Sequence, residues 1–179
     1  MPKLWERLIS GHLALAACFA FAAAVAFQSS RAAEPEAVKI AIFDFELDDR
    51  SAAGGMISPD AIDAENLKKA TDEARQRLAA SGRYLIVHTS GAVGEPASAE
   101  GLQGCDGCEA ALARKLGADQ SMIGIFARVS RTEYTLQIAV RDTKTGAILA
   151  NAFSGLRMGA NYAWPRTVAS LIDNKILSP

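Results

Sequence analysis

Two cysteines three residues apart, Cys105 and Cys108, are the clearest candidates for chemistry in this chain of 179 residues. In an oxidising compartment such a pair forms a disulfide by default. The Cys-x-x-Cys spacing at the start of a helix is also that of thiol oxidoreductases, because a helix N-terminus favours the thiolate. Asp106 lies between the two cysteines and opposes that charge. We therefore predict a structural disulfide, and a redox-active pair is the alternative.

A run of carboxylates, Asp44, Glu46, Asp48 and Asp49, ends the first apolar segment of the main domain. The period of two in a strand places the first three on one face, near the carboxyl edge of a parallel sheet, where open α/β folds bind ligands. Hard cations such as Ca²⁺ prefer these oxygen ligands, but the spacing is not that of an EF-hand. We expect Asp44 and Glu46 to accept backbone hydrogen bonds and the other two to face water. No metal is expected, and a small-ligand or hard-cation edge is the alternative.

Catalytic arrangements have little support in the residue types present. The chain has two histidines, His12 and His88, so a Ser/His/Asp or Cys/His arrangement in the main domain would depend on His88. A closed zinc site needs four nitrogen or sulfur ligands, and only His88 could join the two cysteines. Gly54 and Gly55 lack the spacing of a phosphate-binding loop. The sequence therefore predicts a protein that is not an enzyme and has no cofactor.

A β-α-β unit is expected to position the acidic run. Residues 37–47 predict a strand covered on both faces, with Ile40 and Ile42 on one side and Phe43 and Phe45 on the other. A long amphipathic helix follows, with Ser58 as its cap and Gly82 at its end. The next strand covers 84–88 and should lie parallel to the first through a right-handed crossover.

A flexible loop at about 89–104, rich in glycine and without periodicity, precedes the cysteines. Asp106 and Glu109 then have the spacing of a capping box, which predicts a short helix that ends at Gly117. The expected buried stripe of this helix consists of Cys108, Ala111, Leu112 and Leu116.

Three antiparallel strands and a last helix complete the expected domain. The strands cover 121–129, 132–141 and 148–156. The helix, capped by Asn161, has an apolar face of Trp164, Val168, Leu171, Ile172 and Ile176. The order is β-α-β-α-β-β-β-α, which is a single α/β domain with a mixed parallel and antiparallel sheet packed with three helices, after a signal peptide.

The N-terminal residues have the layout of that signal peptide. Lys3 and Arg7 precede an apolar run, 13–27, which is shorter than the roughly 20 residues that cross a bilayer as a helix. Small residues at Ser30 and Ala32 place the cleavage site after Ala32, with Ala33 as the next candidate. We expect a leader over residues 1–32, one domain over 33–179, a periplasmic location and no membrane span in the mature chain.

A second interpretation of the leader is a lipobox at residues 15–18, in which Cys18 would carry a lipid. The residues that follow Cys18 are apolar, whereas a lipoprotein usually continues into a polar linker, so cleavage after Ala32 is favoured. Acidic and basic residues nearly balance, 20 against 19. This balance predicts no nucleic-acid partner.

Three segments, 38–46, 108–119 and 141–146, resemble the domain shared by the TolB amino-terminal region and the curli-secretion channel protein. Residues 45–49 and 104–109 and the Trp-bearing final helix resemble more closely a family of small, uncharacterised periplasmic proteins of proteobacteria. The resemblance implies a TolB-like α/β fold. It also implies an accessory or interaction module that binds, or helps assemble, a protein of the cell envelope, with no catalytic residues to carry over.

Intact mass spectrometry of non-reduced protein from the periplasm tests the leader and the disulfide together. The mass should correspond to a chain that starts at Ala33 and lacks two hydrogens. Cys105→Ser with Cys108→Ser should leave a folded domain of lower melting temperature, with a loss smaller than the roughly 3 kcal/mol expected for a loop of about 15 residues. Free thiols in native protein, or a lipid on Cys18, would contradict this prediction.

Overall fold

The computed structural model describes residues 36–51, 61–90, 101–130, 133–157 and 163–178. Several expectations lie outside these ranges. They concern the leader with its cleavage site after Ala32, the alternative lipid site at Cys18, the helix caps at Ser58 and Asn161, and residues 91–100 of the predicted loop.

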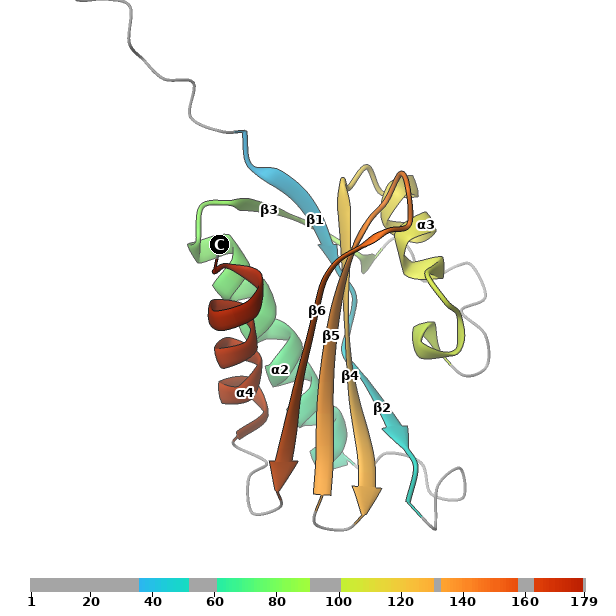
Figure 1. Ribbon diagram of the computed structural model, residues 1–179, viewed down its shortest axis with the longest axis vertical. Coiled ribbons are helices and arrows are strands. Elements are labelled where there is room, and N and C mark those ends of the chain that lie inside the picture. Colours follow the sequence, from blue (N-terminus) through green and yellow to red (C-terminus); the bar gives the residue numbers. More distant parts are fainter. Residues whose placement is uncertain (1–35, 52–60, 91–100, 131–132, 158–162, 179) are drawn as a thin grey trace, which may run out of the picture. The chain divides into compact units, whose positions relative to one another are not determined.

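One mixed sheet of six strands forms the centre of the domain (Figure 1). Five of the strands lie in the order β3 (Tyr84–Val87), β1 (Val38–Ile42), β4 (Gln120–Ser130), β5 (Glu133–Asp142) and β6 (Ile148–Arg157). β1 is parallel to β3 and to β4, whereas β4, β5 and β6 form an antiparallel meander. The predicted fold class, with its parallel unit and its meander, is therefore confirmed.

Two helices, α2 (Ala61–Ala80) and α4 (Ala163–Leu171), cover one face of the sheet (Figure 1), and a π-helical turn, Ile172–Ile176, extends α4. The larger apolar core lies between these helices and the sheet. The predicted apolar face of the final helix is confirmed, because all its members are buried: Trp164, Val168, Leu171, Ile172 and Ile176. None of the helices in the described ranges has both the length and the apolar character needed to cross a membrane.

A third helix, α3 (Cys108–Lys115), lies on the opposite face of the sheet (Figure 1). It covers a smaller apolar cluster that includes Ala41 and Phe43. The buried residues of the helix are Glu109, Ala110 and Ala113. The predicted stripe is therefore misplaced, since Ala111 is exposed and Cys108 is only partly buried.

The sixth strand, β2 (Glu46–Asp49), continues β1 along the same neighbour, β4, with one additional residue. Ile42 is opposite Met122 and Glu46 is opposite Ile125, so the four steps from 42 to 46 face the three steps from 122 to 125. The residues between β1 and β2 therefore form a bulge, which breaks the alternation of side chains.

The bulge turns Phe45 to the same side of the sheet as Ile40 and Ile42. All three belong to the larger core under α2 and α4, whereas Phe43 belongs to the smaller cluster under α3. The prediction of one continuous strand over 37–47, with Phe43 and Phe45 on one face, is therefore wrong. The additional residue shifts the pattern by one position, and a shift of one exchanges the two faces.

Helix α2 supplies the hydrogen bonds that the bulge cannot make within the sheet. The backbone N–H of Phe45 donates to Oγ1 of Thr71 at 2.9 Å, and Arg75 donates to the carbonyl oxygen of Ile42 at 3.0 Å. The ring of Phe45 also packs against Phe126, with 6.3 Å between the ring centroids. Because buried backbone groups need partners, these contacts stabilise the break in the strand.

Gly124 in β4 leaves the space that the Phe45 ring occupies. An ideal Cβ on Gly124 would lie 2.5 Å from two carbons of that ring. Gly124→Ala should therefore lower the free energy of unfolding by about 1–3 kcal/mol, which is the usual effect of overpacking a core. Urea denaturation measures this change. Gly155→Ala in β6 is the matched control, because a Cβ there meets no atom within 4 Å, and equal losses in both variants would contradict the prediction.

Candidate functional site

The bulge separates acidic residues that strict alternation would place on one face. Asp44 lies within the bulge and accepts a hydrogen bond from Arg75 of α2 at 2.8 Å. Glu46 bonds to the segment that leads into α3, on the other side of the sheet, and Asp48 lines a cleft with the same segment. The structure therefore brings Glu46 and Asp48 together but not Asp44, and the expectation of one shared face is wrong for that residue.

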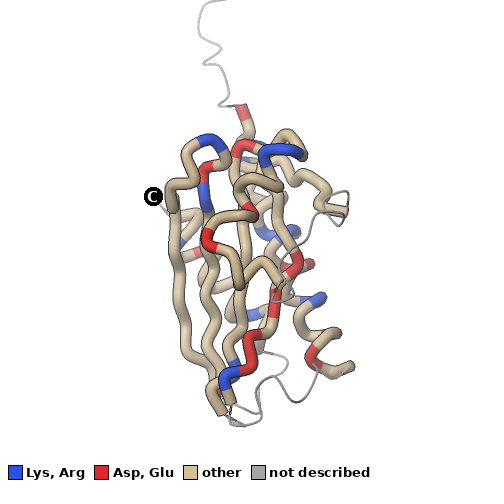
Figure 2. Tube along the Cα trace, turned by 90° about the vertical axis from the view of Figure 1, so that its right-hand side faces the viewer, with Lys and Arg blue, Asp and Glu red and all other residues tan. Residues whose placement is uncertain are grey.

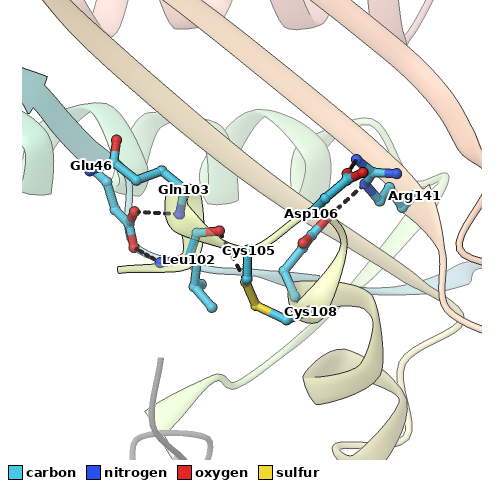
Figure 3. The surroundings of a disulfide bond; sticks show 8 residues. Glu46, Leu102, Gln103, Cys105, Asp106, Cys108 and Arg141 are labelled. Atoms are coloured by element: carbon cyan, nitrogen blue, oxygen red, sulfur yellow. Dashed lines mark hydrogen bonds and ion pairs between the residues drawn. A yellow bond between two sulfur atoms is a disulfide. The ribbon is translucent and has the colours of Figure 1, made fainter. Parts of the chain in front are cut away.

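Glu46 caps a short 3-10 helix, η3 (Leu102–Gly104), that precedes the cysteines (Figure 3). Its two carboxylate oxygens accept the backbone N–H groups of Leu102 at 2.8 Å and Gln103 at 3.0 Å. Gly101 permits this approach, because its φ is 78° and a Cβ there would lie 2.7 Å from the Glu46 carboxylate. The acidic run and the cysteine segment, far apart in the sequence, thus meet at one place.

Cys105 and Cys108 lie directly after this turn, beside the apolar cluster under α3 (Figure 3). Their Cα atoms are 5.7 Å apart, a separation that permits a disulfide. Gly107 between them has a φ of 86°, in the left-handed region that favours glycine. The Cys105–Cys108 disulfide stays a prediction.

Arg141 at the end of β5 holds the start of α3 from the sheet side. It pairs with Asp106 at 2.8 Å and with Glu109 at 2.9 Å, and its other terminal nitrogen donates to the carbonyl of Gly146 at 3.2 Å. No side chain caps the first turn of α3, so the predicted capping box of Asp106 and Glu109 is wrong. Glu109 is only 1 % exposed. A carboxylate this buried is stabilised more by pairing with a positive charge than by a hydrogen bond within a capping box.

Asp49 belongs to a separate ion-pair group with Arg128 of β4. Its carboxylate lies 3.0 Å from Arg128, which also pairs with Asp63 of α2 and donates to the hydroxyl of Tyr134 at 3.1 Å. Hydrogen bonding from Ser51 lowers the pKa of Asp49 below its ordinary value; burial opposes this effect and Arg128 adds to it. Burial disfavours the charge on Arg128, but hydrogen bonds to Asp63 and Tyr134 raise its pKa overall. Asp49 of β2 is thus linked, through Arg128, to Asp63 of α2.

A cleft of about 300 Å³ lies between β2 and the turn before the cysteines. It is lined by Asp48, Arg50, Gln103, Gly104 and Ile125. Asp48 and Arg50, the two charged residues among the described lining residues, pair with each other. A lining with both polar and apolar side chains suits the binding of another molecule. His88 is not among the described residues that line the cleft. Within the described residues, no three His, Cys, Asp or Glu side chains are grouped so as to hold a metal ion.

From Ile125 the sheet continues over β5 and β6 as a surface that no described helix covers. Ile125 is opposite Gln137, which is opposite Phe153, and the neighbouring positions of β5 and β6 point into the core on the other side. We call the row of Ile125, Gln137, Asn151 and Phe153 the open face. None of these four residues is charged. Figure 2 looks onto this side of the sheet, with the acidic β2 in front, and the charged residues of β5, Glu133, Arg141 and Asp142, lie at the ends of that strand.

Two features of the open face favour contact with another molecule. Phe153 is 66 % exposed, the largest value among the exposed large apolar side chains of the described residues. The amides of Gln137 and Asn151 bond to each other at 3.1 Å, so part of their polarity is already satisfied. The open face can therefore be covered at a small desolvation penalty.

The sequence gives little indication that four residues belong to the candidate site: Gln103, Ile125, Phe153 and Arg141. Gln103 lies in a segment without periodicity, and Ile125 and Phe153 belong to strands with apolar residues on both faces. Arg141 carries one usable signal, because it is a charged residue at the end of the alternating strand. Its partners come from another element, which a single sequence does not specify.

Residues 38–176 match the DUF3280 family, described as "Protein of unknown function (DUF2380)". The chain belongs to this family. The expectation of a family without an assigned function is therefore confirmed. Among curated proteins, none matches this DUF3280 member.

Several solved structures are similar to this DUF3280 chain. The LpoB C-terminal domain from Salmonella enterica is 16% identical, with a TM-score of 0.47, 68% of this chain covered and 83% of that chain. Lipoprotein GNA1162 from Neisseria meningitidis is 14% identical, with a TM-score of 0.49 and coverages of 76% and 97%. TolB from Acinetobacter baumannii is 17% identical, with a TM-score of 0.46 and coverages of 77% and 28%.

Replacement of Glu46 tests the junction between β2 and the cysteine segment. Glu46→Ala removes the acceptor of two backbone N–H groups, so the amides of Leu102 and Gln103 should exchange with solvent at least about tenfold faster, as expected for a loss above roughly 1.4 kcal/mol. Hydrogen exchange followed by NMR measures this rate. Glu133→Ala, an exposed glutamate at the start of β5, is the control. Unchanged exchange at both amides in Glu46→Ala would show that the carboxylate does not hold the turn.

Proposed function

We propose that this DUF3280 protein is a non-enzymatic interaction module of the bacterial envelope. It binds another envelope protein, or helps assemble one, through the open face and the adjoining cleft. The observation that carries the proposal is the exposure of Phe153, 66 %, within an uncharged row that spans β4, β5 and β6. The expected leader and the resemblance to periplasmic proteins support the location.

The composition of the surface fits a protein partner. Covering a side chain such as Phe153 contributes about 1.5–3 kcal/mol, and aromatic residues often dominate the energy of interfaces. The Asp48–Arg50 pair at the cleft supplies a polar rim beside this apolar centre. A partner that presents an apolar side chain to Phe153 and hydrogen-bonding groups to the cleft would match both parts.

The arrangement of charges supports binding over catalysis. Asp44, Asp48 and Asp49 are each paired with an arginine, and Glu46 accepts two backbone hydrogen bonds. A general base or nucleophile needs a side chain free to act on a substrate. These carboxylates are instead occupied in holding the fold.

We also propose that the predicted Cys105–Cys108 disulfide is a structural staple. It would fix the chain between η3, which Glu46 holds, and the start of α3, which Arg141 holds. Because η3 contributes Gln103 and Gly104 to the cleft, a fixed turn would keep the cleft preformed.

Comparative capture from envelope extracts tests the proposed function. Wild-type protein should recover a specific envelope protein in stoichiometric amount, and Phe153→Ala should reduce the recovery about tenfold, because about 1.5–3 kcal/mol of burial is lost. Ile62→Ala is the matched control, since Ile62 is also exposed, at 58 %, but lies on α2. Recovery that is equal for all three proteins, or no stoichiometric partner at all, would contradict the proposal.

A further inference from the structure

β6 forms one edge of the sheet and has a strand partner on one side only. Within the described residues it pairs with β5 alone, through Ile148 and residues 150–157, and the register breaks at Leu149. The outer edge of such a strand presents unpaired N–H and C=O groups over a length of about 34 Å. These groups form a template for another strand.

Proteins usually protect long edge strands with charged residues or proline. β6 contains neither from Ile148 to Leu156. Three of its apolar side chains are more than half exposed: Ile148 at 52 %, Leu149 at 52 % and Phe153 at 66 %. Apart from the break in register at Leu149, this edge therefore lacks the charges and prolines that keep edge strands apart.

The opposite edge of the sheet is different. β3 has only four residues, Tyr84–Val87, and Arg83 and His88 flank it on either side. A short strand with polar neighbours is one of the usual ways to block edge pairing. β2, which pairs with β4 alone within the described residues, is also short and carries three carboxylates. The described sheet thus has one long edge without charges, at β6, and two short edges with polar or charged residues, at β3 and β2.

We propose that β6 pairs antiparallel with β6 of a second copy of this chain, so that two sheets become one. Self-pairing uses the same edge on both copies, which closes a two-fold dimer and leaves the short edges of β3 and of the acidic β2 outside. An edge that paired with a different surface of the next copy would instead continue into a fibre. The asymmetry of the two edges therefore favours the closed dimer.

The charge pattern favours a second copy as the occupant. Like charges directly opposite each other destabilise antiparallel pairs. Because no residue from Ile148 to Leu156 is charged, two copies of β6 can align without any such opposition. A register that pairs odd-numbered with odd-numbered residues would also bring the two open faces to one side of the joined sheet.

The test measures molar mass by light scattering on the purified protein, without a partner, over a wide range of concentration. Wild type should have the mass of a dimer. Asn151→Lys with Phe153→Lys places lysines opposite lysines near the centre of the strand, so the mass should halve. Both side chains are exposed, so the variant should stay folded.

Gln76→Lys with Asn174→Lys is the charge-matched control, because both positions are exposed and neither lies on β6 or on the open face. This control should remain a dimer, and the β6 amides should exchange more slowly in the dimer than in the lysine variant. A monomeric wild type would overturn the proposal. This also holds if β6 of the monomer binds a strand of another protein. A dimer that persists in the β6 lysine variant would place the interface elsewhere and overturn it as well. Neither result depends on capture of an envelope protein, so this inference and the proposed function can fail separately.

Discussion

One additional residue between β1 and β2 determines which side of the sheet every following side chain of that segment occupies. Without it, alternation from Ile40 and Ile42 would point Glu46 into the core under α2. With it, Phe45 takes that place and Glu46 reaches η3 on the opposite side. Thr71 and Gly124 make the shift possible, because one accepts the freed N–H of Phe45 and the other leaves room for its ring.

The candidate site depends on two long-range contacts that follow from this arrangement. Glu46 holds the turn before the cysteines from β2, and Arg141 holds the turn after them from β5. The first contact satisfies two backbone N–H groups, and the second sets the charge of Arg141 beside that of the buried Glu109, so each stabilises a preformed surface. The cleft adjoins the turn that Glu46 holds, and Ile125 belongs both to the cleft and to the open face, which is why we interpret the two together as a surface for recognition.

The sequence predicts the elements well and the departures from regularity poorly. The meander follows from clean alternation in β5, where Tyr134, Leu136 and Ile138 all face the core. Residues 37–47 give no indication of the bulge, because apolar side chains occur on both faces of the predicted strand. Phe45 lies on the face under α2 because Gly124, in another strand, leaves room for its ring there. The capping box fails for a similar reason. Asp106 and Glu109 have the correct local spacing, but a buried ion pair with Arg141 outweighs a local hydrogen bond. Exposure of Phe153 depends on how far α3 extends over the sheet, which composition and spacing do not specify.

The side of the sheet that Phe45 occupies is the central claim, and NMR measures it directly. Nuclear Overhauser contacts from the Phe45 ring should connect it to Gly124 and Phe126, which lie under α2 and α4. Contacts from the same ring to Leu102 or Ala113, which belong to the cluster under α3, would contradict the account. In that case the strand would be regular, and Glu46 would not face the cysteine segment.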